Sequence, residues 1–148
     1  MWLSCGSSSS AVQAATIVAQ IISGKYKDDY LCSKWNNSSG SCSYCNFYPG
    51  DCVHYLSGKC PALSYQLQTT LDNCIQFFPT FPDILSPVLD AYGKSALEWS
   101  IFILDPIFSP SVIKLKQEYG FESVQPLMRL SRAYVWTMHR ERMKLSDK

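Results

Sequence analysis

Cysteine is the residue type whose spacing in this chain could do chemistry. Five of the seven cysteines lie within one short stretch that is otherwise rich in Gly, Ser, Asn and aromatic residues. Cys42 and Cys45 form a C-x-x-C pair, the spacing that places two thiolates on one zinc ion. Cys52 and Cys60 could complete a tetrahedral four-thiolate site, and His54 is an alternative ligand two residues after Cys52. The sequence therefore offers zinc as a candidate cofactor, although a second C-x-x-C pair would make the signal stronger.

Disulfide bonds are the alternative use of the same cysteines. Six cysteines from Cys32 to Cys74 make an even set, and six cysteines allow 15 pairings. Residues 36–39 (Asn-Asn-Ser-Ser) contain two overlapping glycosylation sequons, which would suit a secreted loop. Full oxidation would leave Cys5 unpaired. Metal and disulfides are equally supported, and both predict a segment pinned by cross-links. Plain reduced thiols in an aromatic-rich core are the third and weaker possibility.

Catalytic motifs are missing from the sequence. Only His54 and His139 could serve as a histidine base, and neither has a nucleophile placed beside it by a known pattern. There is no G-x-S-x-G, no H-E-x-x-H and no phosphate-binding glycine loop. We therefore expect a protein that is not an enzyme, and we name no catalytic residue.

The elements that must position these residues are predicted from periodicity to be helices. The strongest case is residues 61–78, where Leu63, Leu67, Leu71, Cys74 and Phe78 share one face. Further helices are predicted at residues 11–22, which we expect to be largely buried, and at 83–92, 94–104, 110–119 and 123–145.

These elements predict a mainly α fold of five or six helices packed around one core. The length of 148 residues suits a single domain, 1–148. It would comprise an N-terminal helix (1–24), an irregular Cys-rich segment (25–60) and a helical region (61–148).

The last predicted helix carries the remaining candidate for function. Arg129, Arg132, Arg140 and Lys144 flank Trp136 on the face opposite the apolar one. A Trp among arginines is typical of a protein interface, so docking to other protein subunits is the leading interpretation. Binding to nucleic acid or to an anionic membrane surface is a weaker one, because four charges give modest affinity. Docking leads only among the functional interpretations: on sequence alone, an ordinary solvated helix face with one exposed aromatic residue is favoured over all three.

Composition supports a docking protein. Charged residues are only 17% of the chain, against a usual ~25%, while aromatic residues reach 14%. A surface short of charge suits permanent contacts, and the net charge of +1 gives no bulk attraction to nucleic acid or membrane. The leading hypothesis is a non-catalytic accessory or structural subunit. A zinc-stabilised regulatory or nucleic-acid-binding protein and a secreted disulfide-rich effector or ligand-binding protein are the alternatives.

Targeting signals are weak. No run of ~18 apolar residues predicts a transmembrane segment. Residues 11–22 lack a preceding Lys or Arg and contain Gln13 and Gln20, so they make a poor signal peptide. An intracellular or organellar location is favoured, with secretion as the alternative.

Overall fold

The computed structural model describes residues 8–146 and is helical, with no strand in that range. The helices in chain order are α2 (Ser8–Ile22), α3 (Asp29–Asn36), α4 (Cys52–Leu56), α5 (Ser64–Ile75), α6 (Leu85–Tyr92), α7 (Ala96–Leu104), α8 (Pro110–Tyr119) and α9 (Gln125–Ser146). Two 3-10 turns, η1 (Pro106–Phe108) and η2 (Phe121–Val124), flank α8. The mainly α fold with a Cys-rich segment is confirmed; α3 and α4, inside that segment, bring the described α-helices to eight. Every helix within residues 8–146 is too short or too polar to cross a bilayer.

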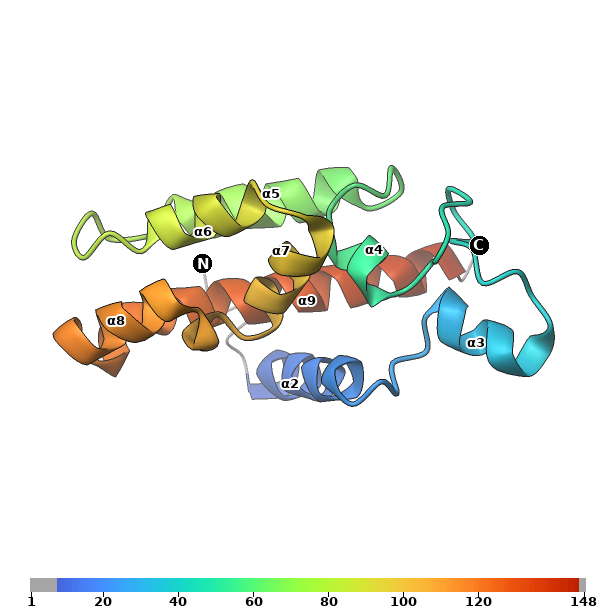
Figure 1. Cartoon of the computed structure of the whole chain (residues 1–148), viewed down its shortest axis with the longest axis horizontal. Coiled ribbons are helices and arrows are strands. Elements are labelled where there is room, and N and C mark those ends of the chain that lie inside the picture. Colours follow the sequence, from blue (N-terminus) through green and yellow to red (C-terminus); the bar gives the residue numbers. More distant parts are fainter. Residues whose placement is uncertain (1–7, 147–148) are drawn as a thin grey trace.

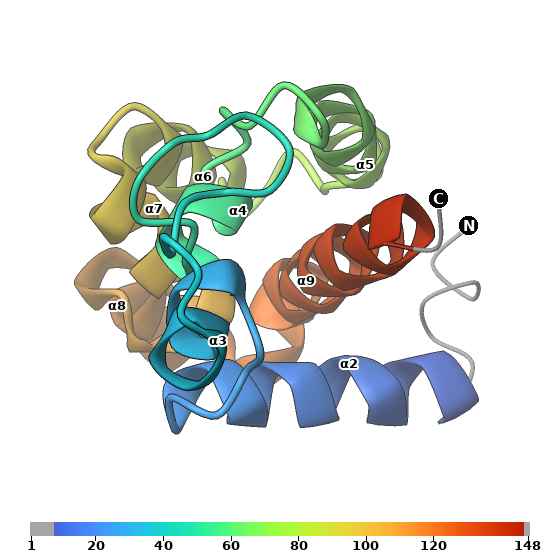
Figure 2. The same cartoon turned by 90° about the vertical axis from the view of Figure 1, so that its right-hand side faces the viewer.

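Helix α9 runs through the centre of the molecule. It lies between α5 on one side and α2 on the other (Figures 1 and 2). The predicted apolar face is buried at Leu127, Leu130, Tyr134 and Met138. Because neighbours cover more than one side of α9, its buried surface is wider than that face and includes polar residues such as Arg142.

Helices α4 and α7 meet α9 through a buried hydrogen-bond network. The indole Nε1 of Trp99, on α7, donates to the carbonyl of Leu56 at 3.1 Å and to the Tyr134 hydroxyl at 3.2 Å. The Tyr134 hydroxyl in turn donates to the Leu56 carbonyl at 2.7 Å. Leu56 ends α4, so this network fixes the end of the Cys-rich segment to the helical core.

Helix α2 departs from its prediction. We expected it to be largely buried, but it buries Ala14 and Ile17 and exposes Val12 and Ile22. The reason is that α2 packs mainly along α9, so only one edge of an apolar helix is covered. The first seven residues of the predicted N-terminal unit (1–24), which include Cys5, lie outside the described residues.

Helix α3 lies at one end of the molecule, beside the loop that leads to α4 (Figure 1). None of its residues is buried. Asp28, the residue before the helix, caps it by accepting a hydrogen bond from the Leu31 amide at 2.8 Å. Local capping therefore holds this helix, and burial in the core does not.

Candidate metal centre

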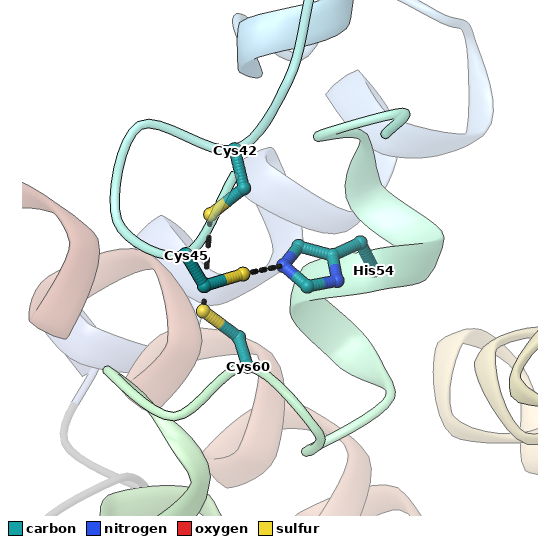
Figure 3. Close-up of side chains that lie close together, drawn as sticks. All are labelled: Cys42, Cys45, His54 and Cys60. Carbon is teal, nitrogen blue, oxygen red and sulfur yellow. Dashed lines mark hydrogen bonds between the residues drawn. The ribbon is translucent and has the colours of Figure 1, made fainter. Parts of the chain in front are cut away.

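Four side chains of the Cys-rich segment converge on one point. The ligand atoms of Cys42, Cys45, His54 and Cys60 all lie within 4.8 Å of one another (Figure 3). The Cys42 and Cys60 sulfurs are 3.8 Å apart, and the Cys45 sulfur is 3.4 Å from the His54 Nε2. Cys42, His54 and Cys60 are buried, and Cys45 is half-buried.

The two shortest of these separations match those between ligands of a zinc ion. Zinc binds sulfur at about 2.3 Å and imidazole nitrogen at about 2.0–2.1 Å, so a tetrahedral site places two sulfurs ~3.8 Å apart and a sulfur and a nitrogen ~3.6 Å apart. The observed 3.8 Å and 3.4 Å are close to both values. A disulfide would need about 2.05 Å between sulfurs, and none of the six cysteines in the described residues forms a disulfide.

Cys52 lies apart from this cluster. Its thiol donates a hydrogen bond to the Asp28 carboxylate at 3.2 Å, and its backbone amide donates to the same oxygen at 3.0 Å. Burial and the neighbouring Asp28 charge raise the pKa of the Cys52 thiol, which disfavours the thiolate a metal needs. Of the predicted four-cysteine set, the structure thus brings together Cys42, Cys45 and Cys60. The alternative ligand His54 takes the fourth place.

The geometry of α4 explains why His54 and Cys52 cannot both face the cluster. Two residues apart on a helix are separated by about 200° around its axis. Asp51 caps α4 by accepting a hydrogen bond from the His54 amide at 3.1 Å, which fixes the start of the helix and so the direction of each side chain. The His54 ring also stacks on Phe47, with centroids 4.8 Å apart. Burial lowers the pKa of His54 and favours the neutral imidazole.

The turn that carries Cys42 and Cys45 is held by backbone hydrogen bonds. The Cys42 amide donates to the Phe47 carbonyl at 2.8 Å, and the Asn46 amide donates to the Cys42 carbonyl at 2.9 Å. The Tyr44 amide donates to the Cys42 sulfur at 3.4 Å. Gly50 passes so close that a Cβ there would lie 2.5 Å from the Cys42 nitrogen. The turn therefore requires glycine at position 50.

A second layer of polar groups supports the cluster. Asp29 accepts hydrogen bonds from the Tyr55 hydroxyl and from Ser43, whose amide lies at 3.0 Å and hydroxyl at 2.8 Å. Burial would raise the pKa of Asp29, but these hydrogen bonds outweigh it and lower the pKa. Burial, and then the hydrogen bond to Asp29, raise the pKa of Tyr55, which remains a hydrogen-bond donor. Supporting layers of this kind orient ligands and tune their affinity for the metal.

The paired thiols show why a cation suits this position. Burial raises the pKa of Cys42, but hydrogen bonds from Tyr55 and from backbone amides outweigh it, so the pKa is lowered. Burial, together with the nearby Cys42 charge, raises the pKa of Cys60 to about 12. Two thiolates this close repel each other, and a divalent cation between them removes that repulsion.

Arg142 is the residue that the sequence did not point to. It is buried near the end of α9, where its guanidinium lies 4.4 Å from the centroid of the Tyr55 ring. Its Nη1 donates to the Tyr26 hydroxyl at 3.0 Å, and that hydroxyl also lies 2.9 Å from the Nδ1 of His139. Arg142 thus connects α9 to the layer behind the cysteines. His139 is half-buried in this contact.

The predicted basic face of α9 is present but partly neutralised. Arg129 and Lys144 are exposed, and Arg132 and Trp136 are half-buried. Glu141 pairs with Lys144 at 3.0 Å and with Arg140 at 3.6 Å. Docking through this face stays a prediction.

Comparisons with protein-family models, with curated proteins and with solved structures gave no match. The interpretation of the centre therefore rests on its own geometry and chemistry.

Proposed function

We propose that a zinc ion bound by Cys42, Cys45, His54 and Cys60 holds the Cys-rich segment in shape, and that the protein works by binding and not by catalysis. The observation that carries this proposal is the convergence of four ligand atoms within 4.8 Å. Four protein ligands complete a tetrahedral zinc site and leave no position for water or substrate, which is typical of structural zinc.

Each part of the chain has a role in this proposal. The turn from Cys42 to Cys45 presents two thiolates, α4 presents His54, and Cys60 follows where α4 ends. Asp29 and Tyr55 steady the turn from behind. The zinc ion would supply positive charge that keeps three neighbouring sulfurs ionised. The zinc-bound segment is called the zinc module below and comprises residues 25–60.

Metal content tests this proposal directly. We expect the purified protein to hold about one zinc per chain by elemental analysis. His54→Ala should lose the zinc, because it removes a ligand. Cys52→Ser should keep it, because the serine hydroxyl can still donate to Asp28. The reverse pattern would favour the four-cysteine set. Metal-free protein whose intact mass rises on reduction would replace the proposal with disulfides, since each bridge gains two hydrogens.

Docking as a subunit of a larger assembly is the second candidate, and one surface favours it. A shallow groove of about 250 Å³ runs between α6, α7 and the start of α8. Ile101 and Phe108 line it and are largely exposed. Large exposed apolar side chains in a groove are typical of protein interaction sites. A native protein that purifies alone, as a monomer, would count against this candidate.

A further inference from the structure

The groove between α6, α7 and the start of α8 combines exposed apolar side chains with negative charge. Ile101 on α7 and Phe108 on η1 line it and are 61% and 72% exposed. Helices α6 and α8 lie toward the end of the molecule opposite α3 (Figure 1), and none of the lining residues belongs to the zinc module. Two large apolar side chains that stay open to solvent within one groove are typical of a binding surface.

Helix α7 carries a carboxylate on each side of this apolar surface. Glu98, Ile101 and Asp105 follow one another at steps of three and four residues, so they share one face of the helix and its C-terminal cap. A separation of seven residues places the two acidic residues about 10 Å apart along the helix axis. Ile101 therefore lies between two acidic groups on the same wall of the groove.

Within residues 8–146, neither of these carboxylates forms an ion pair. Lys94 is the one basic residue that lines the groove, and it pairs with Asp90 at 3.4 Å. Burial raises the pKa of the Asp105 carboxyl, as expected where no cation stabilises its charge. With three acidic side chains and one basic side chain, the lining residues carry a net charge of −2.

The start of α8 offsets this charge only in part. It contributes Ser109, Pro110 and Ser111, which carry no charge, and the two serine hydroxyls lie 3.2 Å from each other. A helix N-terminus has the effect of about +0.5 charge, which salt screens at an exposed position. The groove therefore stays negative, and a positively charged ligand suits it.

This charge decides among the molecules that could cover the groove. A net negative surface repels nucleic acids and anionic membranes. A second copy that docked through the same groove would bring the carboxylates of both copies together, which is costly. A small apolar ligand needs an enclosing pocket of about 300–1,000 Å³, whereas this groove has about 250 Å³ and its apolar side chains are largely exposed. What remains is a protein segment that carries positive charge.

We propose that this groove binds a basic amphipathic segment of another protein. An apolar side chain of the segment packs on Ile101 and Phe108, and a Lys or Arg lies beside each of the two carboxylates of α7. This inference rests on docking, the second candidate function given above, and names the chemistry of the partner. The two cations must span about 10 Å, which is seven residues of a helix or three of an extended chain. Charges of opposite sign across an interface select partners and fix their register.

Selection from a phage-displayed library of random peptides tests the proposal without a known partner. Peptides of about 12 residues are long enough to reach both carboxylates as a helix. We expect the enriched peptides to carry at least two Lys or Arg residues around an apolar one. A fluorescent peptide of the enriched sequence then gives the affinity by anisotropy. Added salt should weaken this binding, because it screens the exposed charges, but should not abolish it, because the apolar contact remains.

Substitutions in the groove locate the binding site. Ile101→Ala should weaken peptide binding at least about 5-fold, the level of a residue that contributes to an interface. Ile22→Ala is the matched control, because Ile22 is 64% exposed on α2, outside the groove. Glu98→Gln combined with Asp105→Asn keeps both shapes, removes both charges and should weaken binding roughly 2- to 30-fold, the range for two exposed ion pairs. Glu122→Gln, on exposed η2, controls for the loss of charge and should change nothing.

Three outcomes would overturn the inference. The first is a selection that enriches no peptide, or enriches peptides with no excess of Lys and Arg. The second is peptide binding that the groove substitutions leave unchanged. The third is self-association of the wild type, seen by sedimentation velocity, that Glu98→Gln with Asp105→Asn abolishes, because the occupant would then be a second copy.

The functions proposed above are tested by other readouts. Metal-free protein would contradict the zinc site whatever peptides are selected. A native protein that purifies alone, as a monomer, would count against a permanent assembly, again independently of the peptides. Failure of the peptide selection therefore speaks only to the groove.

Discussion

The zinc module and the helical region after it hold their shapes by different means. From Leu63 onward, large apolar side chains such as Leu67, Ile103 and Met138 are almost fully buried against one another. In the outer part of the module, α3 buries nothing, and order comes from caps, from hydrogen bonds to Asp28 and Asp29, and from the converging cysteines. Tyr26, Tyr55 and Leu56 of the same module join the buried core. The helical region should therefore fold without metal, whereas the outer part of the module should depend on it.

Helix α4 is where the two regions meet. It has five residues and carries His54 of the cluster and Leu56 of the core network. Between them, Tyr55 lies under the guanidinium of Arg142 from α9. A change at the metal site can thus reach the core through one short helix, while α3, which has no buried residue, has no such connection to the core. This difference gives three predictions that separate the regions.

Trp99→Ala should have the largest effect on folding. Loss of a buried Trp costs about 3–5 kcal/mol, and here it also removes the donor to the Leu56 carbonyl. We expect urea unfolding at saturating zinc to show a loss of that size in the free energy of unfolding. Trp35→Ala, on exposed α3, is the control and should change stability by less than ~0.5 kcal/mol. Equal losses in the two variants would mean that α3 is part of the same cooperative core.

Sequence patterns found the helical region because burial leaves a periodic signal. Leu63, Leu67 and Leu71 recur at helical spacing and are buried as that spacing predicts. Helices α3 and α4 were missed because they are short and follow no apolar pattern. Their signal was an aspartate before each one, Asp28 and Asp51, acting as the N-cap.

The candidate site was only partly predictable, for a similar reason. The spacing of Cys42, Cys45 and Cys60 marked three members of the cluster. The choice between Cys52 and His54 depends on where α4 begins, and one residue of shift would change which side chain faces inward. Arg142 gave no signal at all, because its partners Tyr26 and Tyr55 are distant in sequence.

Gly50→Ala should have the second-largest effect, a loss of zinc affinity, and it should affect the zinc module alone. The new Cβ would lie 2.5 Å from the Cys42 nitrogen, so the backbone carrying that ligand must move. Strain from inserted atoms costs typically about 1–3 kcal/mol, which corresponds to zinc affinity roughly 5- to 150-fold weaker. Competition with a chromogenic chelator measures this affinity.

Gly93→Ala is the matched control for Gly50→Ala. A Cβ at Gly93 meets its nearest atom at 3.6 Å, so the methyl group fits without movement of the chain. Gly93→Ala should keep the zinc affinity of the wild type. If Gly50→Ala also keeps the zinc affinity of the wild type, the turn that carries Cys42 can move to accept the new methyl group. The module would then not be rigid at this turn.

The smallest effect should come from two helix caps that play the same role in different regions. Asp51 caps α4 through the His54 amide, and Ser95 caps α7 through the Glu98 amide at 3.2 Å. Replacing either by Ala should cost about 1 kcal/mol of stability, the usual value for a lost N-cap. Only Asp51→Ala should also weaken zinc binding, because that cap sets the direction of a ligand. Chelator competition and urea unfolding on both variants separate the two effects. If Asp51→Ala and Ser95→Ala have equal zinc affinity, the metal and not the cap positions His54. Zinc binding would then be what orders α4.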